Sequence, residues 1–209
     1  MNNKNILLGI GGVIITFVLL FFAYKLTNTP VKTEFPEVNR IRSTDHVKWK
    51  KDSKNILIEY SDLQCPACKS YNSFLLELEK EATPNAALVF RHYPLYQIHP
   101  NAFNAAYAAE AASLQGKFWE MESILYEKQS DWASLQNPNE FFVSVAKDLE
   151  LDEEQFSKDM SSKEVKERVQ IDLVEAEKIG INSTPTFVLN GVLVNVATFE
   201  EFKEFLMSL

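Results

Sequence analysis

The pattern of apolar and polar residues begins with one continuous apolar run. Residues 6–24 carry no charged side chain and consist mainly of Ile, Leu, Val, Phe and Gly. As a helix, this run would span roughly 28 Å, which is close to the thickness of the hydrocarbon layer of a bilayer. We therefore predict one N-terminal transmembrane helix, so that residues 1–26 form a membrane anchor.

A cleaved signal peptide is the alternative interpretation of the same run. The run is longer than the usual apolar core of a signal peptide, and Ala23-Tyr24-Lys25 is a poor match to a small-residue cleavage site. Lys4 and Lys25 flank the run almost symmetrically, so charge orients it only weakly. The length favours an uncleaved signal-anchor, and either interpretation carries the rest of the chain across the membrane.

The residues after the apolar run change in composition. Residues 27–45 contain Pro30 and Pro36 among Thr, Asn and charged side chains, which is typical of an extended linker. We predict that the folded domain starts near residue 46 and continues to residue 209.

The first half of this domain shows a strand pattern, then a helix pattern, then a strand pattern. Residues 55–60 are a short apolar run after the turn-like Asp52-Ser53. From Pro66, apolar residues recur at the spacing of one helix face: Ala67, Tyr71, Phe74, Leu75, Leu78 and Ala82. Residues 86–92 then read as a second strand, so we predict a parallel βαβ unit.

The C-terminal end predicts a β-hairpin followed by a helix. Residues 186–189 and 192–194 flank Asn190-Gly191, which is a strong signal for a tight hairpin turn. Thr198 and Glu201 have the spacing of a capping box at the start of the last helix.

A helical block separates the two ends, at about residues 100–180. Helix starts are predicted at Asn137-Pro138-Asn139-Glu140, at Asp152 with Gln155, and at Ser161 with Glu164. Gly116 and Gly180 are placed to end helices. The order is βαβ, helical block, hairpin, helix. It predicts an α/β, thioredoxin-like fold with a helical insertion, preceded by the transmembrane helix.

Composition narrows the functional classes. Apolar residues make up 46% of the chain and charged residues 24%, which is ordinary for a globular protein. The formal net charge of -8 argues against nucleic acid as the main partner, because binding to phosphates needs clustered Lys and Arg. The chain has two cysteines, Cys65 and Cys68, so its core must hold the domain together without a disulfide framework.

The two cysteines have the spacing of a redox pair at the start of a helix. Pro66 suits the first helical turn, which places Cys65 at the N-cap, where unpaired backbone N–H groups and the helix dipole favour a thiolate. We predict that Cys65 has a lowered pKa and is the sulfur that exchanges with substrates. Cys68, one turn into the helix, would resolve the mixed disulfide.

A zinc site is the main chemical alternative, because Cys65 and Cys68 also have ligand spacing. It would require His92 and His99 as the other ligands, and their separation is unlike the compact pairs of structural zinc sites. An inert disulfide is a second alternative, but it would close too small a loop to constrain the unfolded chain. We therefore predict no metal site.

At this point the sequence resembles the DsbA-like branch of the thioredoxin superfamily, in particular its membrane-anchored bacterial members. The resemblance covers residues 46–209. It rests on four motifs: Cys65-Pro66-Ala67-Cys68, Arg91-His92-Tyr93-Pro94-Leu95, Gly116-Lys117-Phe118-Trp119-Glu120 and Thr184-Pro185-Thr186.

The resemblance implies roles for residues outside the cysteine motif. Pro185 is expected to be a cis proline that packs beside the reactive disulfide and keeps metal ions from the thiols. Glu59 is expected to be a buried acid that moves protons near Cys68, although a solvent-exposed carboxylate at the strand end is the alternative. Pro66, Ala67 and Thr184 are expected to contact the substrate, with a free backbone edge near Thr184 that pairs with an extended chain.

The expected function is that of a thiol–disulfide oxidoreductase, a single-pass protein of the cell membrane with its catalytic domain on the extracytoplasmic side. It would act as an oxidase that introduces disulfides into unfolded or newly exported proteins, and the resemblance implies an integral-membrane redox partner. No cofactor is expected beyond the Cys65–Cys68 disulfide. Ala67 lacks the histidine of strongly oxidising relatives, so we expect a milder oxidant. An isomerase, a reductase and a non-catalytic peptide-binding chaperone stay open.

Overall fold

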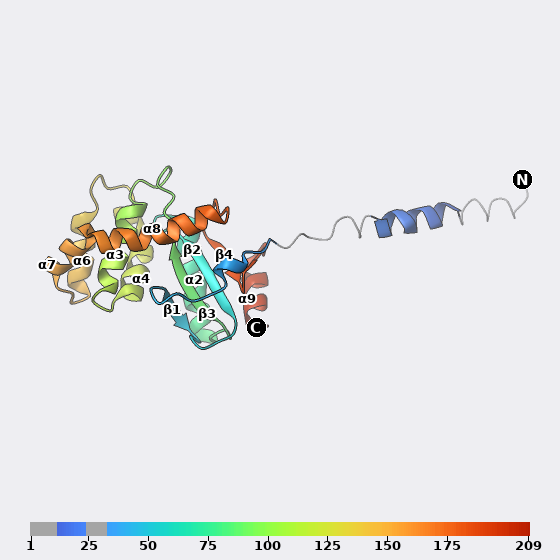
Figure 1. Cartoon of the computed structure of the whole chain (residues 1–209), viewed down its shortest axis with the longest axis horizontal. Helices are drawn as coiled ribbons and strands as arrows, with labels where there is room; N and C mark the ends of the chain where they lie inside the picture. The colour runs from blue at the N-terminus through green and yellow to red at the C-terminus, as the bar shows by residue number, and fades with distance from the viewer. Residues whose placement is uncertain (1–11, 24–32) are drawn as a thin grey trace, which may run out of the picture. The chain divides into compact units, whose positions relative to one another are not determined.

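The computed structural model describes residues 12–23 and 33–209. Residues 12–23 form a helix with exposed side chains (Figure 1). Within the described ranges, no helix is both long and apolar enough to cross a membrane. The remainder of the predicted transmembrane helix, residues 6–11 and 24, lies outside those ranges, as do residues 27–32 of the predicted linker. The membrane anchor therefore stays a prediction.

A five-stranded sheet forms the centre of the folded unit that covers residues 34–209. Its strands lie in the order β1-β3-β2-β4-β5. Strands β2 and β3 are parallel, and every other neighbouring pair is antiparallel. The strands are β1 (His46–Trp49), β2 (Ile56–Ser61), β3 (Ala87–His92), β4 (Thr186–Leu189) and β5 (Val192–Leu193).

The predicted βαβ unit and hairpin are confirmed. Helix α2 (Pro66–Glu81) connects the parallel strands β2 and β3. The turn between β4 and β5 places Asn190 at φ 49° and Gly191 at φ 79°, the left-handed conformations that a tight hairpin turn of this kind requires. The predicted cap is also present, because the Thr198 side chain accepts a hydrogen bond from the backbone N–H of Glu201 at the start of α9 (Phe199–Met207).

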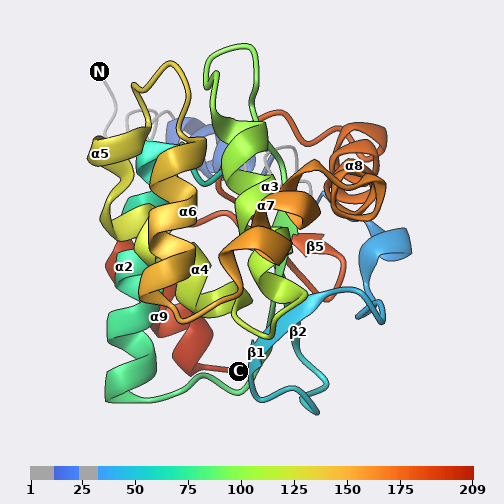
Figure 2. The same cartoon turned by 90° about the vertical axis from the view of Figure 1, so that its left-hand side faces the viewer.

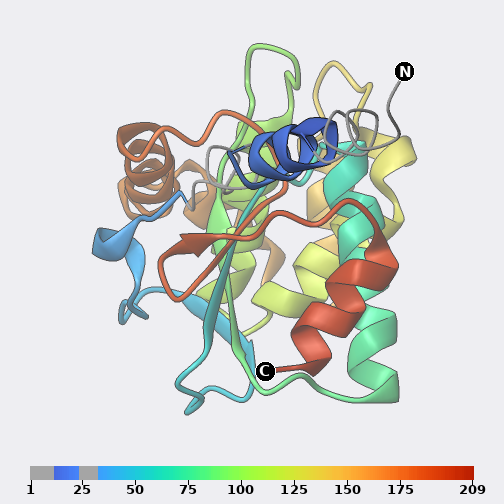
Figure 3. The same cartoon turned by 90° about the vertical axis from the view of Figure 1, so that its right-hand side faces the viewer.

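Helices cover both faces of the sheet. Helices α2 and α9 lie together on one face, while α8 (Lys163–Lys178) lies on the other (Figure 3). Side chains alternate along each strand, so Leu57 of β2 packs into the core under α2 and α9, whereas Ile58 packs under α8. The two faces of the sheet therefore have separate cores.

The predicted helical insert is present and builds a third core. Helices α3, α4, α6 and α7 group beside the sheet (Figure 2). The helices of the insert before α8 are α3 (Ala102–Ser113), α4 (Phe118–Glu127), α5 (Gln129–Trp132), α6 (Asn139–Asp148) and α7 (Glu153–Ser161). Their buried apolar side chains pack in one cluster with Cys65, Cys68 and Phe90. The insert thus packs directly against the cysteine motif.

Helix starts in the insert agree with the sequence at Asp152, whose side chain caps the N–H of Gln155. The prediction of a cap at Ser161 is wrong by one residue. Ser162 is the N-cap of α8 and accepts from the N–H of Val165, because Ser161 still belongs to α7.

The predicted linker is wrong for residues 34–45, which pack onto the folded unit. Val38, in the short 3-10 helix Pro36–Val38, is buried under α8. Arg42 and Asp45 form ion pairs, with Arg42 reaching Asp172 on α8. This segment leads into β1, a strand that the sequence pattern did not reveal. The folded domain therefore includes residues that were assigned to a tether.

Candidate active site

The cysteine motif lies where β2 ends and α2 begins. Cys65 is the N-cap of α2 with extended backbone angles, and Pro66 is the first helical residue, both as predicted. Both cysteines are free thiols. Cys65 is largely buried but keeps 7% of its surface exposed, whereas Cys68 is fully buried. Pro66 and Ala67 are exposed beside Cys65. An incoming sulfur can therefore reach Cys65 and not Cys68.

The surroundings of Cys65 favour its thiolate. The hydrogen bond from the Cys68 thiol is the largest cause, and burial opposes it. Thr184 and the backbone N–H groups of Ala67 and Cys68 add further donors, and together they lower the pKa of Cys65 to about 5. These N–H groups are the unpaired donors of the helix start. Cys65 is thus a thiolate at neutral pH.

Cys68 has the opposite properties. Burial raises its pKa well above the ordinary value, and the neighbouring Cys65 thiolate raises it further. Its sulfur accepts a weak hydrogen bond from the N–H of Asp62 at 3.5 Å. Cys68 is therefore a neutral thiol that must lose a proton before it can attack a disulfide.

Pro185 lies beside the motif, and the Thr184–Pro185 peptide bond is cis, as expected. The Cys65 sulfur is 3.6 Å from the carbonyl oxygen of Thr184. Strand β4 starts at Thr186 and pairs with β2 and β5. The segment before β4 therefore passes directly over the reactive sulfur.

Glu59 is buried, with 4% of the residue exposed, so the solvent-exposed alternative is wrong. It lies on the same face of β2 as Ser61, whose hydroxyl donates to Glu59 Oε1 at 2.7 Å. Burial raises the pKa of Glu59 to about 6, against the lowering effects of Ser61 and Lys48. A carboxylate with this pKa can gain and lose a proton near neutral pH.

Helix α4 supplies two further polar side chains to this buried region. The Tyr126 hydroxyl is 2.8 Å from the Ser61 hydroxyl, and it donates a longer bond of 3.4 Å to the carbonyl oxygen of Asp62. Glu122, one turn earlier, is 3% exposed. Its burial raises its pKa to about 7, opposed by Lys48 and assisted by Glu59. Two carboxyl groups able to hold a proton thus lie on the inner side of the site.

The loop before Cys65 is fixed by hydrogen bonds from distant elements. The Asp62 carboxylate accepts from the N–H of Gln64 at 2.8 Å, from the N–H of Leu95 at 2.9 Å and from His99 Nδ1 at 2.7 Å. Gln129 donates to the carbonyl oxygens of Leu63 and Cys65. This geometry holds Cys65 in place relative to the insert.

The two histidines considered as zinc ligands have other partners. His99 contacts Asp62, and His92 Nε2 lies 3.1 Å from Glu110 on α3. In the described part of the chain, no group of three or more His, Cys, Asp and Glu side chains has an arrangement that would hold a metal ion.

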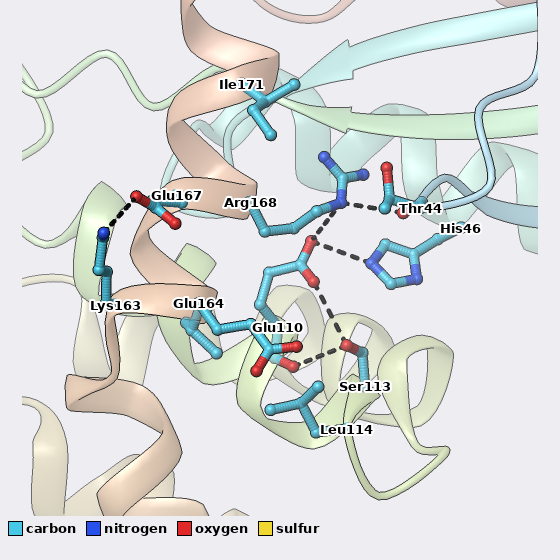
Figure 4. Close-up of a pocket in the computed structure, with 11 residues that line it drawn as sticks. Thr44, His46, Glu110, Ser113, Leu114, Lys163, Glu164, Glu167, Arg168 and Ile171 are labelled. Carbon is cyan, nitrogen blue, oxygen red and sulfur yellow. Dashed lines mark hydrogen bonds and ion pairs between the residues drawn. The ribbon is translucent and has the colours of Figure 1, made fainter.

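One cavity, of about 570 Å³, lies between α3 and the first half of α8 (Figure 4). Its walls include His46, Glu110 and Arg168, which lie close together in the close-up, and neither cysteine lines it. Glu110 accepts from His46 at 2.9 Å and lies 3.9 Å from Arg168. His46, Glu110 and Arg168 are thus paired with one another, whereas Glu59 and Glu122 form no ion pair within the described residues.

The structure brings together the residues that the sequence singled out. Around Cys65 lie Cys68, Thr184 and Pro185, and Glu59 lies on the inner side. Sequence reasoning missed Ser61, Glu122 and Tyr126. The position of Ser61 could have been predicted, because a residue two positions after Glu59 on a strand points to the same face of the sheet. The positions of Glu122 and Tyr126 depend on how the insert folds back, which no local pattern reports.

Comparison with known proteins agrees with this fold and site. A family model described as thioredoxin (Thioredoxin_4) matches residues 42–208. Among solved structures, the oxidised form of BdbD from Bacillus subtilis is similar, with a TM-score of 0.70 and 22% identity over 87% of this chain and 98% of that one. The α-DsbA1 protein of Wolbachia pipientis has a TM-score of 0.69 and 18% identity, covering 83% of this chain and 96% of that one.

Curated relatives are similar over a shorter part of their length. The Na(+)/H(+) antiporter NhaA 1 of Mycolicibacterium vanbaalenii is 38% identical over 152 residues, which are 71% of this chain and 24% of the antiporter. The chain therefore spans about a quarter of the length of this relative.

Proposed function

This chain belongs to the thioredoxin family, and from that membership and the geometry around Cys65 we propose that it is a thiol–disulfide oxidoreductase. The observation that carries the proposal is the asymmetry of the two sulfurs. Cys65 is accessible and has a pKa lowered to about 5, while Cys68 is buried with a raised pKa. Dithiol–disulfide exchange requires these two roles, a reactive thiolate that exchanges with the substrate and a second thiol that resolves the mixed disulfide.

The exchange proceeds in two steps. A substrate thiolate attacks Cys65 of the Cys65–Cys68 disulfide, which breaks that bond, forms a mixed disulfide and leaves Cys68 to take up a proton. A second thiolate of the same substrate then attacks the substrate sulfur that is bonded to Cys65. This forms the substrate disulfide and releases Cys65 as a thiolate. Electrons pass from substrate to protein, and the disulfide is the only redox group needed. Glu59 is the acid that supplies the proton to Cys68.

We favour the oxidase direction. Every interaction that stabilises the Cys65 thiolate stabilises the reduced form and makes the disulfide a stronger oxidant. Ala67 brings no charge to the thiolate, so the oxidant is milder than relatives with histidine there. Reductase and isomerase activity are the alternatives in the other direction.

Substrates are unfolded or newly exported proteins, bound as extended chains. Pro66, Ala67 and Thr184 lie around Cys65 and provide a contact surface with little side-chain chemistry, so it suits varied sequences. The anchor at residues 6–24 holds the domain on the extracytoplasmic side of the cell membrane, where an integral-membrane partner reoxidises the dithiol.

The reduction potential of the Cys65–Cys68 couple tests the direction. Equilibration with glutathione buffers, followed by alkylation of free thiols, should give a value well above the roughly −270 mV of thioredoxin. A value near that of thioredoxin overturns the oxidase assignment.

A peptide-binding chaperone is separated from an oxidoreductase by Cys65→Ser. The variant should lose the oxidation of a dithiol peptide completely. If the protein is a chaperone instead, Cys65→Ser still protects an unfolded protein from aggregation. The unmodified protein then shows this protection and no oxidation of the peptide.

A further inference from the structure

The buried side of the site contains a hydroxyl group, on Ser61, that bonds to the acid Glu59 and belongs to the chain segment against which Cys68 packs. Ser61 Oγ lies 2.7 Å from Glu59 Oε1 and 2.8 Å from the Tyr126 hydroxyl. Cys68 Sγ lies beside the same point of the chain, 3.5 Å from the backbone nitrogen of Asp62, and Ser61 lowers the pKa of Cys68, which burial raises. Ser61 is 1% exposed and Tyr126 is 1% exposed, so bulk water does not compete for these bonds.

We infer that Ser61 is the proton relay between Cys68 and Glu59, and that Tyr126 is the positioning residue that holds the Ser61 hydroxyl in place. This inference rests on the proposed disulfide exchange and deepens it. A serine hydroxyl has one proton to donate and two lone pairs. With the Ser61 proton donated to Glu59, one lone pair accepts from the Tyr126 hydroxyl, whose proton is shared with the more distant carbonyl oxygen of Asp62, and the second lone pair is available for the proton of Cys68.

Protons, electron pairs and bonds balance in the step in which Cys68 attacks the mixed disulfide. The Cys68 thiol passes its proton to Ser61 Oγ while Ser61 passes its own proton to Glu59. The electron pair left on Cys68 attacks the Cys65 sulfur, the Cys65–Cys68 bond forms, and the bond from Cys65 to substrate breaks with its electron pair on the substrate sulfur. When Cys68 instead leaves as a thiolate, the same protons move in reverse.

The groups that face Glu59 agree with this role. Lys48 of β1 lowers its proton affinity, while burial raises it. Glu122 of α4 is the other nearby carboxyl, and each of the two makes ionisation of the other less favourable. Phe90 and Phe187 of the neighbouring strands pair with Glu59 across the sheet and are apolar. Within the described residues, neither carboxyl forms an ion pair, so the proton is free to move.

The reaction of the reduced, full-length protein with the chromogenic disulfide dithiobis(nitrobenzoate) distinguishes attack by Cys65 from attack by Cys68. Attack by Cys65 releases one chromophore in a phase that depends on reagent concentration. Attack by Cys68 on the resulting mixed disulfide releases a second chromophore in a phase that does not. The relay acts only in the second phase.

Ser61→Ala should slow the second phase by about 100-fold and leave the first phase within about twofold, because general acid–base assistance contributes on that scale. In the unmodified protein the second phase should rise with pH through about 6, the pKa of Glu59, and Ser61→Ala should lose that rise. Tyr126→Phe should show a smaller loss, and Ser61→Thr, which keeps a hydroxyl, should recover the pH dependence.

Matched controls are Ser144→Ala on α6 and Tyr93→Phe, whose hydroxyl bonds to Ile181; both should leave both phases unchanged. A second phase in Ser61→Ala with unmodified rate and pH profile overturns the relay. Equal loss of both phases also overturns it, because that outcome indicates a structural role. If the unmodified protein shows no fast first phase, the disulfide-exchange function fails instead.

Discussion

Two regions of the domain contain buried charged side chains, and they differ in whether those charges have partners of opposite charge. On the face covered by α8, Arg91 donates to Asp45 at 2.8 Å and to Glu175 at 2.7 Å. On the face covered by α2, Glu59 and Glu122 are buried, and within the described part of the chain neither forms an ion pair. Arg91 is matched by opposite charge, and Glu59 and Glu122 are not.

The carboxyl pKa values follow from this difference. Burial of Glu110 would raise its pKa, but hydrogen bonds from His46 and His92 bring it well below the ordinary value. Burial of Glu59 and Glu122 has weak opposition, so their pKa values rise to about 6 and about 7. The paired carboxylates hold elements together, whereas the unpaired ones cost stability and are suited to carry protons.

The largest change in the free energy of unfolding is expected when the ion pairs of Arg91 are removed. Arg91→Met leaves Asp45 without its main buried partner and should lower the free energy of unfolding by about 3 to 5 kcal/mol. Denaturant unfolding at neutral pH measures it. Lys158→Met, which removes an exposed ion pair with Glu154, is the matched control and should change stability by less than about 1 kcal/mol. A similar small change in both variants would contradict the comparison.

A gain in stability, and not a loss, is expected when the unpaired carboxyl group of Glu122 is replaced. The folded pKa of Glu122 lies above its unfolded value, so the fold favours the protonated form and loses stability as the pH rises from about 4.5 to about 7. Glu122→Gln cannot ionise and should therefore be more stable than the unmodified protein by about 3 kcal/mol at pH values above that range. The gain should vanish at acid pH. Unfolding curves across pH test this, and a variant less stable at high pH would show that Glu122 is structural.

A smaller loss is expected for Glu110→Gln. Its folded pKa is lowered, so its charge contributes stability that is present above the unfolded pKa of a carboxyl and disappears as the pH falls. The variant should lose about 2 kcal/mol at neutral pH, the scale of hydrogen bonds to a charged group, and this loss should shrink toward acid pH. The same unfolding series measures both glutamates, and parallel pH profiles would contradict the distinction between paired and unpaired carboxyl groups.

The sequence predicted the features that depend on short stretches of chain. Asn190-Gly191 dictates its own turn, Thr198 and Glu201 form a cap within one helical turn, and Pro66 after Cys65 marks a helix start. The order of these elements, together with the motif at Pro185, was enough to predict the fold and the reactive sulfur.

The missed features depend on contacts between distant parts of the chain. Arg42 and Asp45 read as linker residues because their charges look solvated. Their partners come from distant elements, since α8 supplies Asp172 to Arg42 and β3 supplies Arg91 to Asp45. Glu122 and Tyr126 read as ordinary helix residues. The fold of the insert carries them to Ser61, 65 positions away from Tyr126 in the chain.

Trapping of the mixed disulfide tests the role of Cys65 most directly. Cys68→Ser protein, incubated with a peptide that carries one activated disulfide, should accumulate a stable adduct, and mass spectrometry of its fragments should place the peptide on Cys65. Cys65→Ser protein should form almost none, because Cys68 is buried and protonated. Equal adduct formation by the two variants, or none by either, would contradict the assignment of Cys65 as the exchanging sulfur.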